Sequence, residues 1–370
     1  MNSQNNAQLI KLAEHYFRSG NYSFAQDLLK QILDSNPADS KANELAAYIA
    51  GNAGNVELAL KLLHKACQQP DCSPEALYYL GTSHLRNTQF HDAIECFKKS
   101  IKKTGYFFEV THDLGLAYFH IQKYSESIEF LNKALEIKPN SFEALTNLGN
   151  SLKASNRYED ALLYQNKAIN IDPQNVEGWL NKGAILNELK RYEEALSQYD
   201  HAIQLQPTYL EAWSSKGHTL FALAQYDEAL AHYNQAYQLE PDLDFLLGNL
   251  VHVKMLISDW SDFKNEISEF ANKINDRQKV SVPFYLLSVM DSPNLHLLTA
   301  RTWSDNKYPS NSSLPQIPKY QNKKIRIGYF SADFKSHPVA YLTAELFELH
   351  DRNSFEVFAF ALKSAHDNDP

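Results

Sequence analysis

The chain has 370 residues, of which 44% are hydrophobic and 21% charged, with a formal net charge of −9. That length exceeds a single compact domain, and the acidic balance argues against nucleic acid or an anionic membrane as a partner. Residues 1–11 lack the pattern of a signal peptide, and no stretch approaches the ~18 apolar residues of a membrane span. We therefore expect a cytoplasmic protein that contacts no membrane.

A unit of about 34 residues repeats seven times over residues 6–243. Its eighth position holds a small residue in every copy: Ala13, Ala47, Gly81, Gly115, Gly149, Gly183 and Gly217. A second small residue occupies the twentieth position: Ala25, Ala59, Ala93, Ser127, Ala161, Ala195 and Ala229. Proline closes five of the units: Pro37, Pro139, Pro173, Pro207 and Pro241. A period held over seven copies indicates an array of stacked repeats.

The spacing matches the tetratricopeptide pattern, in which each unit is a pair of helices. Glycine inside a helix costs about 1 kcal/mol relative to alanine, so its recurrence indicates a close helix crossing. We expect the glycine at position eight to meet the alanine at position twenty. Stacked pairs bury a continuous core and leave a concave groove, which predicts a mostly α solenoid.

The groove is expected to be lined by positions five, six and nine of the first helices. Position six holds a polar residue in four consecutive repeats, and position nine adds two more: Asp113, Asn147, Asn181 and Ser215, then Asn150 and His218. An amide both donates and accepts hydrogen bonds, so a row of asparagines can hold an extended backbone without demanding a sequence. We interpret Asp113, Asn147, Asn150, Asn181 and Ser215 as a candidate peptide-binding site. The alternative interpretation is a row of solvated polar groups.

The cysteines and histidines predict no redox or metal site. Cys67, Cys72 and Cys96 are expected on repeat helices as buried, reduced thiols, because their spacing is not that of a CxxC motif. The histidine pairs His84/His91 and His112/His120 straddle the turn between helices and have no carboxylate motif beside them.

The repeat pattern decays after residue 243. Val251, Trp260 and Phe263 stand where glycine, tyrosine and alanine are expected. Large side chains forbid the close crossing, so residues 244–307 are predicted to form capping and transition helices, one starting near Pro283 and another over 297–303. Three prolines mark residues 308–323 as a linker: Pro309, Pro315 and Pro318.

Beyond the linker the hydrophobic pattern is no longer that of paired helices. Residues 324–331 and 355–362 are apolar runs of strand length, and residues 338–350 have helical spacing. This strand–helix–strand order predicts the opening of a parallel α/β sheet.

The string Gly-Tyr-Phe-Ser-Ala-Asp-Phe-Lys-Ser-His-Pro at 328–338 resembles the start of the catalytic region of the O-GlcNAc transferase/SPINDLY family. Ser-Asp-Trp-Ser-Asp-Phe at 258–263 resembles the segment that joins repeats to catalytic lobe in that family. The resemblance covers essentially the whole chain. It implies tetratricopeptide repeats followed by a two-lobed, Rossmann-like GT-B glycosyltransferase, of which residues 324–370 would be an incomplete N-terminal part.

The family carries a histidine of this string at its active site, and the matching residue is His337. Ligands of parallel α/β sheets bind beyond the carboxyl ends of strands, which is where His337 falls. A neutral imidazole there can take a proton or a hydrogen bond from a substrate hydroxyl, as a base or as a positioning group. The alternative interpretation is a loop residue before a helix. The family holds its nucleotide-sugar mainly in the second lobe, so no donor-binding residue is assigned.

The preferred function is the substrate-recruiting repeat region of a protein O-glycosyltransferase. The resemblance implies transfer of a sugar, GlcNAc from UDP-GlcNAc, to Ser/Thr hydroxyls of proteins bound in the groove, with no metal and no other cofactor. We expect this chain to be an inactive fragment of the larger enzyme. The alternatives are a non-enzymatic adaptor that binds other proteins, or a SPINDLY-type O-fucosyltransferase that uses GDP-fucose.

Overall fold

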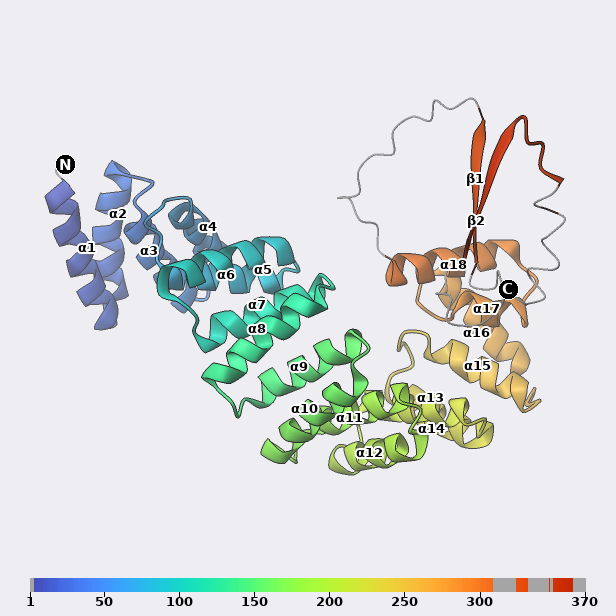
Figure 1. Cartoon of the computed structure of the whole chain (residues 1–370). Helices are drawn as coiled ribbons and strands as arrows, with labels where there is room; N and C mark the ends of the chain where they lie inside the picture. The colour runs from blue at the N-terminus through green and yellow to red at the C-terminus, as the bar shows by residue number, and fades with distance from the viewer. Residues whose placement is uncertain (1–2, 309–323, 332–345, 347–348, 362–370) are drawn as a thin grey trace. The chain divides into compact units, whose positions relative to one another are not determined.

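The computed structural model describes residues 3–308, 324–331, 346 and 349–361. Contacts divide the chain into two units, residues 1–307 and residues 308–370. In the described residues, the first unit is built of helices and the second contains two strands (Figure 1). The predicted fold class, a helical repeat solenoid followed by the start of an α/β region, is confirmed.

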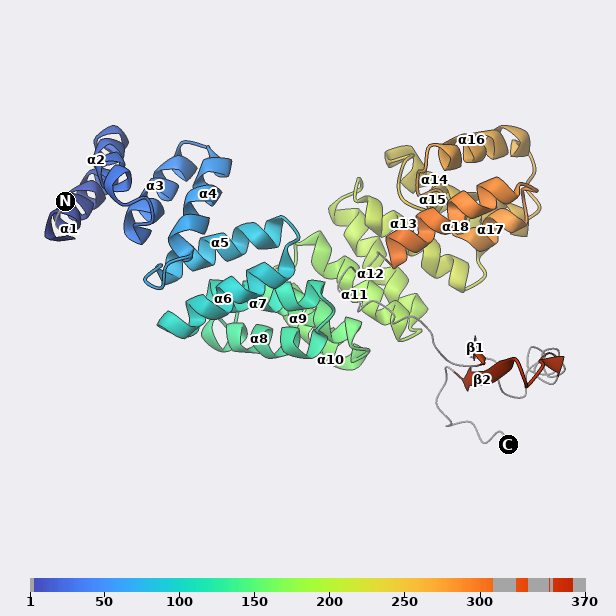
Figure 2. The ribbon, with the colours of Figure 1, turned by 90° about the horizontal axis from the view of Figure 1, so that it is seen from above.

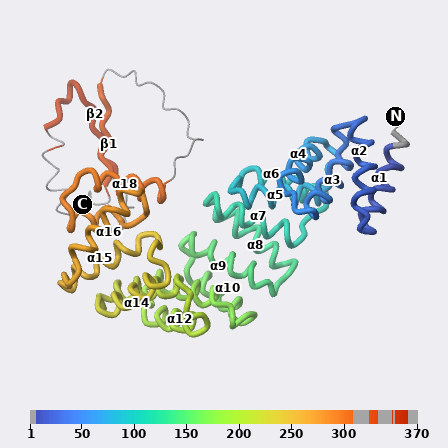
Figure 3. The backbone as a smooth tube through the Cα atoms, turned by 180° about the vertical axis from the view of Figure 1, so that it is seen from behind, coloured from blue at the N-terminus to red at the C-terminus, as the bar shows by residue number. Residues whose placement is uncertain are grey.

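The repeats are seven helical hairpins in which the two helices of a unit lie side by side and the next unit packs against them. Figures 2 and 3 show this succession from above and from behind. The helices are α1 (Ser3–Arg18), α2 (Tyr22–Ser35), α3 (Ser40–Asn52), α4 (Val56–Cys67), α5 (Pro74–Arg86), α6 (Phe90–Thr104), α7 (Phe108–His120), α8 (Tyr124–Ile137), α9 (Phe142–Ala154), α10 (Tyr158–Ile171), α11 (Val176–Glu188), α12 (Tyr192–Leu205), α13 (Leu210–Ala222) and α14 (Tyr226–Leu239).

Each hairpin turns through one residue in the left-handed backbone region, and these residues recur once per repeat at the same position. Their φ angles lie between +58° and +78°: Gly20, Gly54, Thr88, Gln122, Asn156, Lys190 and Ala224. The next amide then closes the first helix, as where the Arg191 N–H donates to the Leu186 carbonyl at 2.9 Å. Glycine fills this place in two units, so the turn is imposed by the repeat rather than by glycine.

The glycine at position eight makes a close helix crossing. At Gly149 the atoms nearest to an added Cβ include the carbonyl oxygen of Ala161 at position twenty, as predicted, whereas at Gly183 and Gly217 they belong to another residue. A Cβ built on Gly183 would lie 2.5 Å from Cε1 of Tyr199, and one on Gly217 would lie 2.7 Å from Cδ1 of Tyr233. These tyrosines occupy position twenty-four, one helical turn beyond the alanine at position twenty. The alanine is fully buried, but the larger ring reaches further across the crossing and fills the space above the glycine.

The eighth unit keeps the backbone turn although its side-chain pattern has gone. Ser258 adopts the left-handed conformation, with φ +61°, exactly one repeat length after Ala224. Helices α15 (Leu246–Leu256) and α16 (Phe263–Asn275) flank it. In the seven repeats the second helix starts two residues after the turn residue, whereas α16 starts at Phe263 and leaves Trp260 half exposed. Helices α17 (Pro283–Leu287) and α18 (Pro293–Lys307) follow, and α18 is longer than the predicted 297–303.

The prediction of buried, reduced thiols is confirmed for Cys96 and wrong for the other two cysteines. Cys96 is free, and burial raises its pKa to about 11. Cys67 ends α4 and Cys72 lies in the loop before α5, and a disulfide joins them. The chain reverses direction over residues 68–71, which brings their Cα atoms to 4.9 Å, within the range that a disulfide spans.

In the second unit, β1 (Ile325–Ser331) and β2 (Phe355–Ala361) pair in parallel, as predicted. Ile325 lies opposite Phe355 and the register continues to the far end of both strands. The rings of Phe330 and Phe360 stack with centroids 4.6 Å apart. The helix predicted over 338–350 falls almost entirely outside the described residues.

Candidate functional site

The candidate groove residues lie on consecutive first helices, α7, α9, α11 and α13, which are neighbours in the stack. Asp113 is on α7, Asn147 and Asn150 on α9, Asn181 on α11 and Ser215 on α13. All five are partly accessible rather than fully buried or fully exposed. The repeat therefore places them in sequence along one face, but their roles differ.

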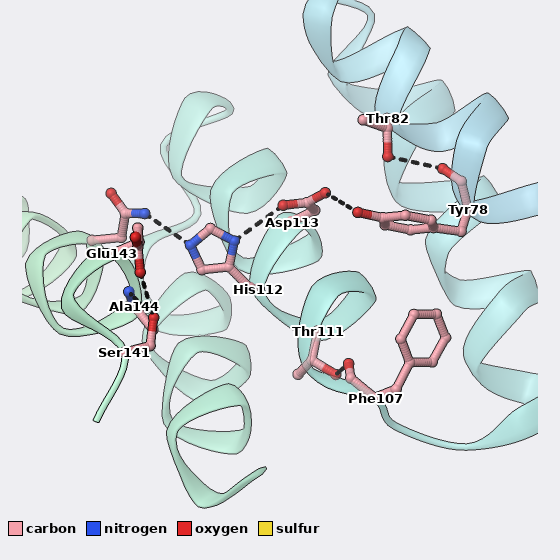
Figure 4. Close-up of polar contacts among 10 residues, drawn as sticks. Tyr78, Thr82, Phe107, Thr111, His112, Asp113, Ser141, Glu143 and Ala144 are labelled. Atoms are coloured by element: carbon pink, nitrogen blue, oxygen red, sulfur yellow. Dashed lines mark hydrogen bonds and ion pairs between the residues drawn. The ribbon is translucent and has the colours of Figure 1, made fainter. Parts of the chain in front are cut away.

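Asp113 and Asn147 belong to a chain of hydrogen bonds that crosses three repeats. Figure 4 shows its part through Tyr78, Asp113 and His112. The Tyr78 hydroxyl donates to Oδ2 of Asp113 at 3.2 Å. Oδ1 of Asp113 lies 3.0 Å from Nδ1 of His112, and Nε2 of His112 lies 3.0 Å from Nδ2 of Asn147. The carboxylate of Asp113 is thus engaged by groups of its own chain, and it is not open to a ligand as the candidate peptide-binding site supposed.

The chain of contacts is largely shielded from water. The side chains of His112 and Asp113 are 14% and 17% exposed. Burial, reinforced by the charge of Asp113, raises the pKa of Tyr78 to about 12, so this phenol stays a donor. The ring of Phe108 stacks on His112 with centroids 5.6 Å apart, and Nζ of Lys138 lies 5.0 Å from the centroid of the Phe108 ring. Such a sheltered network holds its members in fixed orientations.

Other polar residues of α9 and α11 differ from this network, because they carry buried polar atoms without partners. Within the described residues, Oδ1 of Asn150, Nδ2 of Asn181 and Oγ1 of Thr146 are buried and make no hydrogen bond. An unpaired buried donor or acceptor costs about 1–3 kcal/mol. Asn150 offers an acceptor and Asn181 a donor, which is the pair of groups that a peptide unit would satisfy.

Sequence reasoning did not single out Tyr78, and it assigned no role to His112 beyond excluding a metal site. The signal that could have revealed them is a pair of polar residues 35 positions apart, which is one repeat length plus one residue. Tyr78 reaches Asp113 and His112 reaches Asn147 by this step, from position five of one repeat to position six of the next. The same step leads from Thr146 on α9 to Asn181 on α11. Oγ1 of Thr146 and Nδ2 of Asn181 are two of the buried atoms without a partner.

The N-terminal repeats present an open hollow instead of a polar row. In three other repeats an aromatic pair closes the hairpin: Phe17 with Tyr22, Phe119 with Tyr124, and Phe221 with Tyr226. The second repeat has Gly51 and Val56 at these places. A hollow of about 780 Å³ lies there, lined by Gly51, Val56, Tyr48 and other residues of α1, α3, α4 and α5. A Cβ added to Gly51 would meet nothing within 4 Å.

His337, the predicted catalytic residue, lies outside the described residues. Across the described ranges, no cluster of three or more His, Cys, Asp or Glu side chains could hold a metal ion. Of the helices within those same ranges, none has both the length and the apolar character to cross a membrane.

Comparison with known proteins agrees with this architecture. Residues 13–230, more than half of the chain, match the family model described as the tetratricopeptide repeat protein 21 N-terminal ARM repeat, and residues 306–369 match glycosyl transferase family 41. The chain therefore belongs to the tetratricopeptide-type repeat family that the first model describes. The second match, C-terminal to these repeats, confirms the resemblance to the O-GlcNAc transferase/SPINDLY family.

A relative and two solved structures illustrate the likeness. The chain is 29% identical over 135 residues to the probable UDP-N-acetylglucosamine–peptide N-acetylglucosaminyltransferase SEC of Arabidopsis thaliana, an alignment of 32% of this chain and 14% of that protein. YrrB, described as a TPR protein with an unusual peptide-binding site, is 21% identical over 51% of this chain and 97% of its own, with a TM-score of 0.46. MamA is 23% identical over 44% of this chain and 95% of its own, with a TM-score of 0.40.

Proposed function

We propose that the face formed by α7, α9, α11 and α13 binds extended segments of protein substrates. The support comes from Asn150 and Asn181, whose buried acceptor and donor lack partners among the described residues. A peptide backbone supplies an N–H and a C=O at each residue and demands no particular side chain. Asn147 on α9 and Ser215 on α13 would add further contacts with the peptide. Asp113 would contribute indirectly, through the chain of hydrogen bonds that ends at Asn147.

The proposal extends to chemistry: this chain is the protein-recruiting part of a protein O-glycosyltransferase. One observation carries it, namely that a repeat region and a family 41 glycosyltransferase region occur in one chain. The intact enzyme would transfer GlcNAc from UDP-GlcNAc to Ser/Thr hydroxyls of the bound segment, without a metal. His337 would accept the hydroxyl proton or position the hydroxyl, and the donor is assigned no residue of this chain.

The peptide-binding part is tested by replacing Asn147 and Asn181 with alanine together. Each lost hydrogen bond should cost about 0.5–1.5 kcal/mol, so the double variant should bind unstructured Ser/Thr-rich peptides of unrelated sequence about 5- to 150-fold more weakly. Asn170→Ala, an exposed asparagine on α10, is the matched control and should leave affinity unchanged. Undiminished binding by the double variant in fluorescence anisotropy would rule out this face as the binding site.

The chemical part is tested on the protein with its complete catalytic region. His337→Ala should lower turnover strongly while peptide affinity stays constant, because the repeats fold and bind independently of that residue. Parallel assays with UDP-GlcNAc and GDP-fucose decide the donor. Retained peptide binding without transfer from either donor would instead favour a non-enzymatic adaptor.

A further inference from the structure

Hydrogen-bonding logic fixes which atoms of the His112 ring carry a proton. The carboxylate of Asp113 accepts but does not donate, so the His112 nitrogen that faces it, Nδ1, must carry the hydrogen of that 3.0 Å contact. In the neutral ring Nε2 is then an acceptor. Its partner at 3.0 Å, Nδ2 of Asn147, is therefore the donor of the second contact.

The consequence is that the amide of Asn147 cannot turn freely. While the imidazole is neutral, the NH₂ group of Asn147 is committed to His112, because exchanging the positions of its oxygen and nitrogen would place two acceptors, Oδ1 and Nε2, against each other. Among the described residues nothing donates to Oδ1 of Asn147, and this oxygen is not among the buried unpaired atoms. The accessible polar end of this side chain is thus a carbonyl oxygen.

Contacts with Asp113, Asn147 and Phe108 hold the imidazole of His112 in this orientation. On α7, Asp113 holds Nδ1, and the hydroxyl of Tyr78 on α5 fixes the other oxygen of that carboxylate. The ring of Phe108 covers one face of the imidazole.

We propose that Tyr78, Asp113 and His112 are positioning residues that make Asn147 a dedicated hydrogen-bond acceptor. The ligand group that this rung selects is then a donor: a backbone N–H of an extended polypeptide. This inference rests on the peptide-binding function proposed above, and it adds that Asn147 accepts a hydrogen bond from the peptide and does not donate one. A segment whose N–H is missing at that place, as at proline, is disfavoured there.

A matched pair of substitutions separates this role from a merely structural one. Glutamine carries its amide oxygen at the distance of Nε2, so His112→Gln can still accept from Asn147. Asparagine places its amide at the distance of Nδ1, so His112→Asn can still donate to Asp113 but cannot reach Asn147. We expect His112→Gln to bind peptide nearly as the wild type does and His112→Asn to bind about 2- to 13-fold more weakly.

The probe is a labelled, unstructured peptide of alternating Ser, Thr, Ala and Val, together with its single N-methylated analogues. One N-methyl position should weaken binding to the wild type by the same factor as Asn147→Ala and should not weaken binding to Asn147→Ala further. His112→Asn should likewise add nothing on the Asn147→Ala background, because it acts through that residue. Thermal melts of each variant check that folding is retained.

Four results would overturn the inference. If His112→Asn and Asn147→Ala, combined in one protein, weakened peptide binding by the product of their separate factors, His112 would act on the fold and not through Asn147. Equal losses of affinity for His112→Gln and His112→Asn would mean the same. ¹⁵N resonances of the Nε2–H tautomer in the free protein would remove the acceptor on which the argument depends. If Asn147→Ala is neutral while Asn181→Ala weakens binding, the rung is wrong but the groove function stands. If both are neutral, the groove function itself fails.

Discussion

The same substitution, glycine to alanine, should have opposite effects at two places in this protein. At Gly183 the new Cβ would lie 2.5 Å from Cε1 and 2.9 Å from Cδ1 and Cζ of Tyr199. That ring is 2% exposed, so it has no free space to move into. At Gly51, also within a first helix, the new Cβ would meet nothing within 4 Å because it faces the hollow of the second repeat.

The expected magnitudes follow from two opposing terms. Alanine is about 1 kcal/mol better than glycine in a helix, and overpacking a sealed core typically costs about 1–3 kcal/mol. An overlap with a ring wedged between two helices belongs at the upper end, so Gly183→Ala should lose about 2 kcal/mol net. Gly51→Ala, close to its helix end, should gain about 0.5 kcal/mol. Adding Tyr199→Leu should restore much of the loss, since alanine and leucine occupy these two positions together in the second repeat, as Ala47 and Leu63 of one core cluster.

Urea unfolding followed by circular dichroism, with hydrogen exchange by mass spectrometry, measures both size and reach of the effect. Repeats couple mainly to their neighbours, so Gly183→Ala should loosen amides over residues 176–243 and leave those before residue 100 almost unchanged. Equal stabilisation by both alanine variants would refute the close crossing. Uniform loss of protection over all seven repeats would refute the nearest-neighbour picture.

Two further predictions concern the turns and the buried tyrosines. Thr88→Gly should raise the free energy of unfolding by about 1 kcal/mol, because a β-branched residue is strained at φ +59°, whereas Asn156→Gly at the equivalent turn should change it less; equal gains in urea melts would contradict this. Burial raises the pKa of Tyr199 to about 12, above the value near 10 of an unfolded chain, so the unfolded state loses this proton first as pH rises. The contribution of Tyr199 to the free energy of unfolding should therefore fall by about 1.4 kcal/mol per pH unit between pH ~10 and ~12, and Tyr199→Phe should remove that contribution from the total slope; an unchanged slope in the variant would exclude it.

The sequence predicted the fold well because the repeat period is a local signal that recurs seven times. Small residues at positions eight and twenty reveal a helix crossing, but they do not reveal which large side chain fills it. The partner of Gly183 was therefore placed one turn too early, at Ala195 rather than Tyr199.

The polar chain through His112 was harder to predict, because it joins residues of different repeats. Helical spacing relates residues three or four apart, whereas Tyr78 and Asp113 meet through the stacking of α5 on α7. Likewise, the disulfide of Cys67 and Cys72 depends on the path of a loop, which no periodic pattern encodes. The repeat period placed the candidate residues on consecutive first helices, but it did not reveal the hydrogen bonds among them.

Because a left-handed turn residue recurs at the same position of each repeat, one whole repeat can be deleted without changing the backbone conformation at the junction. Joining Ser155 directly to Lys190 deletes one whole repeat length, replaces one turn residue with another of nearly equal φ, and sets Gly149 opposite Tyr199, the ring that now packs on Gly183. No new turn has to be invented at the junction. Loss or duplication of one such DNA segment would thus shorten or lengthen the proposed peptide-binding face by one repeat, so that a gene can adjust the length of this face in discrete steps.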